Sequence, residues 1–242
     1  MNAPPGKPPL LSLKNVVSGY RELDVLRGIT FDVSAGQVIT VVGPNGHGKS
    51  TLLKTISGLV PLKQGSISIN GGPTIAQPHT IAGMGVAHVP QGDMLFPEMS
   101  VLENLLMGAY LVPSKAEIDR RLDEVCTLLP KLSDRRHQMA WSLSGGERRM
   151  VGIGRGLMMG GAIMLIDEPS LGLAPLIIEQ IYGVIAELSK SGRTILLVEE
   201  NPARVADLAD HLHLLDDGAI VWSGPPAELL ARDELLATYL GG

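Results

Sequence analysis

The amino-acid sequence predicts an α/β protein with a parallel-sheet core, an N-terminal antiparallel β-subdomain and an inserted helical subdomain. Three observations support this fold class. Residues 38–42, 162–166 and 194–198 are continuous apolar runs, which are typical of parallel strands buried on both faces. Residues 10–37 instead contain stretches in which apolar and polar residues alternate, as in antiparallel strands. Between about residues 92 and 160 the apolar residues recur at helical spacing.

The composition is that of a single large globular domain. The chain has 242 residues, of which 45% are hydrophobic but only 3% aromatic, so the core must consist mainly of Leu, Ile, Val, Ala and Met. Residues 1–9 are Pro-rich and polar, which predicts a flexible segment followed by one domain over residues 10–242.

Charge and hydropathy exclude several classes of protein. A formal net charge of −5 and a pI near 5.7 argue against a broad nucleic-acid-binding surface, so we expect protein partners and no nucleic acid. No apolar run reaches the roughly 18 to 20 residues that span a bilayer. The first nine residues are too polar for a signal peptide, and we therefore expect a cytoplasmic protein.

The first half of the chain predicts a strand, a loop and a helix in that order. The buried strand at residues 38–42 enters a Gly-rich loop, and a helix follows from Ser50. The apolar residues at helical spacing in this region are Leu52, Leu53, Ile56 and Leu59.

The second half predicts the inserted helices and the return of the parallel core. Residues 100–103 and 114–117 are two capping-box candidates for helix starts. A helix at residues 176–189 would connect the strands at 162–166 and 194–198 in the βαβ manner. An Asp-Gly turn at residues 217–218 predicts a hairpin, and a last helix is expected over residues 226–240.

Residues 43–50, Gly-Pro-Asn-Gly-His-Gly-Lys-Ser, fit the phosphate-binding pattern G-x-x-x-x-G-K-[ST]. The glycines let backbone N–H groups turn toward phosphates, and the helix N-terminus adds a favourable dipole. Lys49 is expected to contact the β and γ phosphates of ATP, and the Ser50 hydroxyl is expected to bind Mg²⁺. A Gly-rich turn without a ligand is the structural alternative, and the pattern alone leaves kinases, GTPases and other ATPases open. The predicted nucleotide-binding residues of this segment are Gly43, Pro44, Asn45, Gly46, His47, Gly48, Lys49, Ser50 and Thr51.

Two acids, Asp167 and Glu168, directly follow the apolar run at residues 162–166. They would lie at the carboxyl edge of a parallel sheet, where ligands of open α/β folds bind. Asp167 suits the Mg²⁺ shell, and Glu168 suits the general base that polarises the attacking water. A solvated acidic turn is the alternative, but the preceding phosphate loop favours the catalytic interpretation.

Residues 143–149, Leu-Ser-Gly-Gly-Glu-Arg-Arg, resemble the signature of the ABC ATPase family, which is Leu-Ser-Gly-Gly followed by Gln or Glu. The resemblance extends from residue 11 onward and implies a P-loop NTPase of the ABC ATPase type. It also implies a head-to-tail dimer, in which Ser144, Gly145, Gly146 and Glu147 bind the ATP held by the other subunit's phosphate loop. The alternative is a helix N-cap with incidental glycines.

Further positions match this family by order and context. Tyr20 resembles the aromatic residue on which adenine stacks, although a core tyrosine at a strand end is the alternative. Gln91 resembles the glutamine that contacts Mg²⁺ and the attacking water. The alternative is an exposed glutamine in a loop without a role in binding. The segment at residues 96–105 resembles the surface that receives short helices of the membrane partners.

Three residues depart from the family pattern. Glu200 stands where most ABC ATPases have a histidine that contacts the γ-phosphate, and a carboxylate would repel that group. We therefore expect Glu200 to alter catalysis at this subunit's own site. Ala174 replaces a commoner Asp, which puts signalling across the dimer in doubt. His47 occupies a position usually held by a small residue, and it is either an outward-pointing side chain or a new phosphate contact.

These departures resemble one of the two ATPase subunits of branched-chain amino acid importers, through residues 170–175, 197–201 and 239–242. Importers of urea or short amides share most of these features. The resemblance implies a homodimer or heterodimer with a second ABC ATPase subunit, integral membrane permease subunits, and indirectly a periplasmic solute-binding protein. The chain would then lie on the inner face of the plasma membrane.

Two other classes of protein remain as alternatives. One is an ABC ATPase that acts on ribosomes or DNA, although the chain shows neither a second cassette nor a long coiled-coil insertion. The other is a regulatory ATP-binding module without hydrolysis, which Glu200 suggests and Glu168 argues against.

Overall fold

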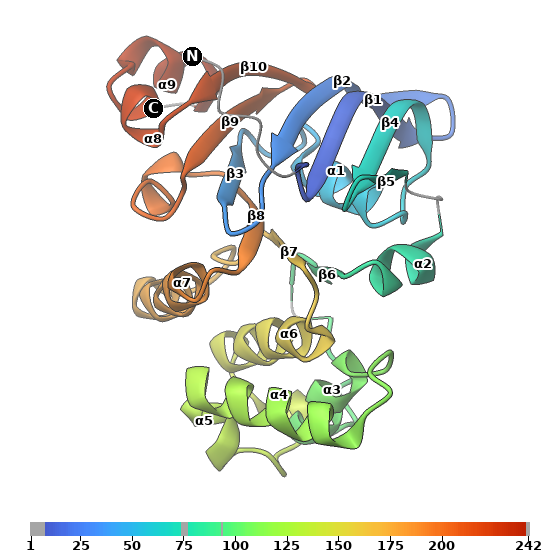
Figure 1. The fold of residues 1–242 in the computed structure, drawn as a ribbon. Helices are drawn as coiled ribbons and strands as arrows, with labels where there is room; N and C mark the ends of the chain where they lie inside the picture. The colour runs from blue at the N-terminus through green and yellow to red at the C-terminus, as the bar shows by residue number, and fades with distance from the viewer. Residues whose placement is uncertain (1–7, 74–76, 93, 241–242) are drawn as a thin grey trace.

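The computed structural model describes residues 8–73, 77–92 and 94–240, and it contains two sheets (Figure 1). The first sheet is antiparallel, with strand order β2-β1-β4-β5. Its strands are β1 (Leu11–Tyr20), β2 (Leu23–Val33), β4 (Leu62–Ile69) and β5 (Gly72–Pro73). This sheet is the predicted N-terminal antiparallel subdomain. The proposed flexible segment at residues 1–9 lies almost wholly outside the described residues.

The second sheet is the predicted core, with strand order β10-β9-β3-β8-β7-β6. Its strands are β3 (Val38–Val42), β6 (Val86–Val89), β7 (Ile163–Asp167), β8 (Thr194–Glu199), β9 (His211–Asp216) and β10 (Ala219–Gly224). All neighbouring pairs are parallel except the β9–β10 hairpin. Every residue of β3, β7 and β8 is buried, as their continuous apolar runs predict.

Helices flank this sheet and form a separate group at one end of the molecule. Figure 1 shows α3, α4, α5 and α6 gathered away from β1, β2 and β4. The four helices are α3 (Val101–Gly108), α4 (Lys115–Leu128), α5 (Pro130–Asp134) and α6 (Gly145–Met159). The others are α1 (Lys49–Ile56), α2 (Pro78–Gly83), α7 (Pro175–Lys190), α8 (Pro226–Leu230) and α9 (Asp233–Leu240).

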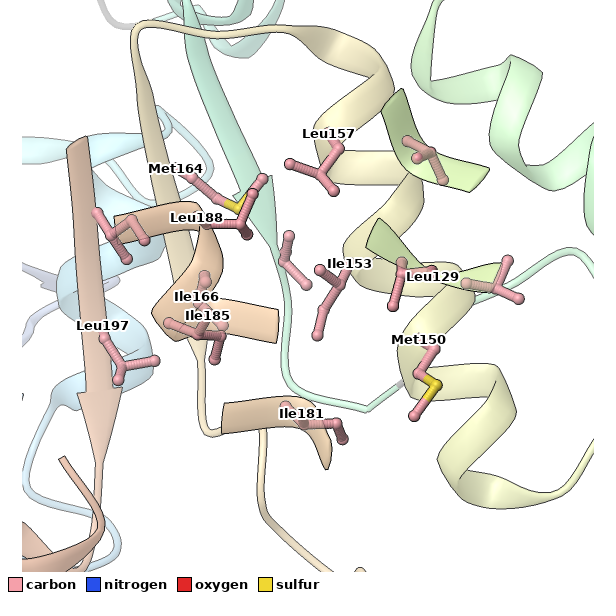
Figure 2. Close-up of a cluster of buried hydrophobic side chains, with 14 of the residues drawn as sticks. Leu129, Met150, Ile153, Leu157, Met164, Ile166, Ile181, Ile185, Leu188 and Leu197 are labelled. Atoms are coloured by element: carbon pink, nitrogen blue, oxygen red, sulfur yellow. The ribbon is translucent and has the colours of Figure 1, made fainter. Parts of the chain in front are cut away.

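Helix α6 joins the helical group to the core sheet. Figure 2 shows side chains of α6 and α7 directed into the same interior as those of β7 and β8. Full burial of each such aliphatic side chain stabilises the folded state by about 1.5–3 kcal/mol relative to leaving it exposed to water. Gly156 lets α6 approach β6, because a Cβ atom there would lie 2.5 Å from Cγ2 of Val89. The helix that begins with the signature segment therefore packs on the strand that leads to Gln91.

The two capping-box candidates have different outcomes. At Ser100 the box is complete, because Glu103 accepts from the Ser100 backbone N–H while Ser100 accepts from that of Glu103. At Ser114 only the hydroxyl caps the helix. The Glu117 carboxylate binds the guanidinium groups of Arg120 and Arg121 instead, so this expected box is only half formed.

Several elements differ from the sequence-based expectations. Leu59 lies beyond the end of α1 and is 58% exposed, because the chain turns at Gly58, where φ is 73°. The expected single helix over residues 226–240 is two short helices, α8 and α9. The sequence did not predict strands β4, β5 and β6 or helix α2. The Asp-Gly turn is confirmed, with positive φ at Asp217 and Gly218 between β9 and β10.

Candidate nucleotide site

The phosphate-binding pattern forms the loop between β3 and α1. Gly46 and Gly48 have φ of 86° and 108°, which a residue with a side chain rarely adopts. At Gly43 a Cβ atom would lie 2.1 Å from the backbone oxygen of Leu215, so only glycine fits there. The loop borders a cavity of about 320 Å³. The residues lining the cavity are Asn45, Gly46, Gly48, Lys49, Ser50, Thr51, Gln91, Glu168 and Leu171.

A buried ion pair lies at the floor of this cavity. Lys49 Nζ is 3.0 Å from Glu168 Oε1, and the two side chains are only 3% and 5% exposed. Lys49 Nζ also donates to the backbone oxygens of Gly43 (2.7 Å) and Pro44 (2.9 Å). The second carboxylate oxygen of Glu168 accepts from Gln91 Nε2 at 2.7 Å. The structure thus brings together three residues predicted from separate parts of the sequence.

Asp167 and Ser50 form a second polar contact beside the loop. Ser50 Oγ donates to Asp167 Oδ1 at 2.9 Å. Asp167 Oδ2 is buried and has no hydrogen-bond partner among the residues that the structure describes. Burial raises the pKa of Asp167, although the bond from Ser50 opposes the rise. An unsatisfied carboxylate oxygen next to a hydroxyl is the oxygen donor set that Mg²⁺ prefers, so these residues fit that ion.

The side chain of His47 faces away from the lining of the cavity. Its Nδ1 lies 2.8 Å from Oδ1 of Asp216, at the end of β9. The Gly218 N–H donates to the backbone oxygen of His47 at 3.2 Å. These contacts attach the phosphate loop to the β9–β10 turn, and they leave the His47 ring in the outward position that the sequence analysis considered.

Tyr20 and Glu200 both lie at strand ends and are exposed. Tyr20 ends β1 and is 47% exposed, so its ring is accessible for stacking. Glu200 follows β8, and its backbone N–H donates to Glu199 Oε2 at 2.8 Å. Neither residue is among the described residues that line the cavity.

The signature segment caps α6 and lies outside the cavity lining. Glu147 Oε2 accepts from the backbone N–H and the hydroxyl of Ser144, at 2.9 and 2.8 Å. Its other oxygen is 2.9 Å from Arg135 Nε. Burial opposes ionisation of Glu147, but the bonds from Ser144 and the charge of Arg135 outweigh it and lower the pKa. Ser144 and Gly145 are exposed and Gly146 is buried.

The sequence profile of the ABC transporter family matches residues 26–171, which include the phosphate loop, the signature and both acids. This chain belongs to the ABC transporter family. It is an ATP-binding and ATP-hydrolysing subunit of a transporter, as the sequence predicted. No helix within residues 8–73, 77–92 and 94–240 has the length and apolar character needed to cross a membrane.

The alignments with curated relatives span nearly the whole chain of this ABC ATPase. It is 39% identical to the high-affinity branched-chain amino acid transport ATP-binding protein BraG of Pseudomonas aeruginosa, over 96% of this chain and 100% of the relative. It is 37% identical to the probable branched-chain amino acid transport ATP-binding protein LivF of Archaeoglobus fulgidus, over 93% of this chain and 95% of the relative. It is 30% identical to the lipopolysaccharide export system ATP-binding protein LptB of Escherichia coli, over 96% of this chain and 97% of the relative.

Solved structures support the ABC ATPase fold. The ADP conformation of MJ1267, an ATP-binding cassette of an ABC transporter, superposes with a TM-score of 0.84 at 28% identity, over 95% of this chain and 98% of that one. A nucleotide-free ATP-binding cassette from an ABC transporter superposes with a TM-score of 0.82 at 28% identity, over 94% of this chain and 97% of that one.

Sequence reasoning missed two buried charged residues beside the site. Arg149 of α6 is 4% exposed and donates to the backbone oxygens of Pro90 (3.3 Å) and Glu168 (3.5 Å). Glu199, at the end of β8, is 1% exposed. The signal for Glu199 was present, because it ends a buried apolar strand just as Asp167 does.

We expect Lys49→Met and Glu168→Gln to be energetically coupled in the nucleotide-free protein, because each change alone leaves the other charge buried. A double-mutant cycle on the free energy of unfolding in urea should give a favourable coupling of about 0.5–3 kcal/mol. Lys190 and Glu187, whose side chains are 72% and 58% exposed, provide a control pair with coupling close to zero. A cycle at Lys49 and Glu168 that equals the control would contradict the buried ion pair.

Proposed function

We propose that this ABC ATPase hydrolyses Mg·ATP to power the import of branched-chain amino acids. The observation that carries the proposal is its 39% identity to BraG over the relative's full length. The 30% identity to LptB, part of an export system, is lower over a similar share of the chain. Importers of urea, short amides or other amino acids are the alternative within the same role.

The chemistry follows from the groups that surround the cavity. Lys49 and the loop N–H groups would bind the β and γ phosphates, and Tyr20 would stack on adenine. Ser50, Gln91 and Asp167 would hold Mg²⁺, which neutralises phosphate charge when it is bound. Binding of phosphates to Lys49 replaces its pairing with Glu168, and this frees the carboxylate to accept a proton from the attacking water.

The signature segment supports a site shared between two cassettes. The donors that a phosphate would need, the N–H and hydroxyl of Ser144, are directed to the Glu147 carboxylate in this structure. A nucleotide held by the neighbouring cassette would replace that carboxylate at the start of α6. Gly145 and Gly146 would allow its phosphate to approach the backbone closely. We propose a heterodimer, because Glu200 departs from the histidine that most ABC ATPases have at this position.

A second surface supports a permease partner. An apolar hollow of about 570 Å³ lies where the helical group meets the core. Phe96, Met107 and Tyr110 line it and are 43%, 42% and 83% exposed. Exposed apolar side chains in one hollow are typical of protein interfaces. We propose that a short helix of an integral membrane permease packs there, on the cytoplasmic face of the plasma membrane, and that a periplasmic solute-binding protein acts through this permease.

Glu168→Gln should separate nucleotide binding from hydrolysis in the assembly purified with its cassette and permease partners. ATP affinity should change by less than about threefold, whereas hydrolysis should fall by about 10²-fold or more, because the amide cannot accept a proton. Glu187→Gln, on the exposed end of α7, is the matched control and should hydrolyse ATP normally. If Glu168→Gln hydrolyses ATP at the control rate, Glu168 is not the base.

Glu200→His should raise ATP turnover by on the order of tenfold, because imidazole can donate to the γ-phosphate and removes a repelling charge. Glu200→Ala removes only the charge, so its turnover should lie between those of the natural protein and Glu200→His. Turnover numbers at saturating ATP test this. Equal turnover in all three proteins would show that residue 200 does not act on the γ-phosphate.

A further inference from the structure

Glu199 is a buried carboxylate to which the proposed mechanism assigns no role. It is the last residue of β8 and is 1% exposed, whereas its neighbour Glu200 is exposed. Burying an ionised carboxylate is costly unless hydrogen bonds replace the lost water. The contacts of this side chain therefore indicate why the position tolerates a charge.

Groups from four segments surround the Glu199 carboxylate. Its Oε1 accepts from the Tyr182 hydroxyl of α7 at 2.7 Å and from the Ser170 hydroxyl. Its Oε2 accepts from the Glu200 backbone N–H at 2.8 Å. Arg204 Nη1 lies 3.8 Å from Oε2 and donates to Ser170 Oγ at 2.7 Å. Three donors and one nearby cation make this a well-satisfied buried anion.

Tyr182 remains a donor in this network. Burial, followed by the negative charge of Glu199 and the hydrogen bond to it, raises the pKa of the Tyr182 hydroxyl. The phenol therefore keeps its proton over the working pH range. Ser170 also has both of its roles filled, because it donates to Glu199 and accepts from Arg204.

The network holds the turn that carries Glu168. Glu168 has a φ of 41°, a left-handed conformation that a residue with a side chain keeps only where its surroundings fix it. On one side of this turn the Glu168 N–H donates to the backbone oxygen of Val198 at 3.1 Å. On the other side, two residues later, Ser170 binds Glu199. The last two residues of β8 thus hold the turn at both ends.

We propose that Glu199 is a positioning residue that fixes the Glu168 turn through Ser170 and orients Glu200 through its backbone N–H. This inference rests on the proposed role of Glu168 as the base. The Glu199 side chain acts on the placement of Glu168, whereas its backbone oxygen accepts from the Gly43 N–H of the phosphate loop at 3.3 Å. A substitution that changes only the side chain should therefore affect kcat and leave ATP affinity unchanged. A displacement of about 1 Å at a catalytic group can cost about 10²-fold in rate.

Glu199→Gln is the principal test, in the assembly that hydrolyses ATP. Glutamine keeps the size of the side chain, but its amide nitrogen cannot accept a hydrogen bond, so at least one donor loses its acceptor. We expect kcat to fall by about tenfold to hundredfold while the Kd for ATP, measured with a fluorescent ATP analogue, changes by less than about twofold. Glu199→Asp, which keeps both acceptor oxygens, should recover part of the loss.

Ser170→Ala should lower kcat in the same way, and the double variant with Glu199→Gln should lose less than the product of the two single effects. Ser191→Ala is the matched control, because this part-buried hydroxyl at the far end of α7 donates to the Leu188 oxygen, within its own turn. Its kcat should be unchanged.

The outcomes separate this inference from the proposed function. If Glu168→Gln abolishes hydrolysis and Glu199→Gln keeps the natural kcat, the positioning role is wrong and the catalytic role stands. If Glu199→Gln loses ATP binding and kcat in parallel, the carboxylate only maintains the fold and the inference is overturned. If Glu168→Gln itself hydrolyses ATP normally, the proposed role of Glu168 as the base is wrong, and the positioning role of Glu199 fails with it.

Discussion

The structure depends most on the burial of opposite charges at the floor of the phosphate cavity. Lys49 is the first residue of α1 and Glu168 directly follows β7, and the 3.0 Å contact between them joins the two parts of the site. Such a pair is not a large net source of stability, because both charges lose their hydration. Its consequence is geometric, because neither group can be moved without leaving the other unpaired. We propose that ATP replaces this contact, because its phosphates would supply the negative charge that pairs with Lys49.

Around this pair, two further buried charged residues contact the segments that carry Glu168 and Gln91. Glu199 holds the Glu168 turn through Ser170 on the β8 side. Arg149 approaches from α6, the helix that begins at the signature segment, and donates to the backbone oxygens of Pro90 and Glu168. A shift of α6 would therefore act on the loop of Gln91 and on the backbone of Glu168 together. This arrangement gives a physical route from the signature segment to the subunit's own cavity.

The sequence was sufficient wherever a local pattern determines the structure. The phosphate loop, the buried strands and the Ser100 cap depend on residues close together in the chain. Prediction failed where residues far apart in the sequence determine the local structure. Strand β4 contains the exposed polar residues Lys63, Gln64 and Ser66, so only pairing with β1 reveals it. The capping box at Ser114 is incomplete, because the Glu117 carboxylate accepts hydrogen bonds from Arg120 and Arg121 instead of from the Ser114 backbone. Glu199 acquires its surroundings from Ser170 and other segments, which no spacing rule predicts. The catalytic and nucleotide-binding assignments of the individual residues stay predictions.

We propose that a complete ATP site needs two cassettes, one supplying Lys49 and Glu168 and the other supplying Ser144. The most direct measurement is the rate of ATP hydrolysis per molecule of this chain, at fixed saturating ATP, as a second cassette subunit is added. The rate should be low for the dilute chain alone and should rise to a plateau as the second cassette binds. A rate that is constant at every concentration of either subunit would show that the ATP site is complete within one chain, and would rule out a site shared between two cassettes.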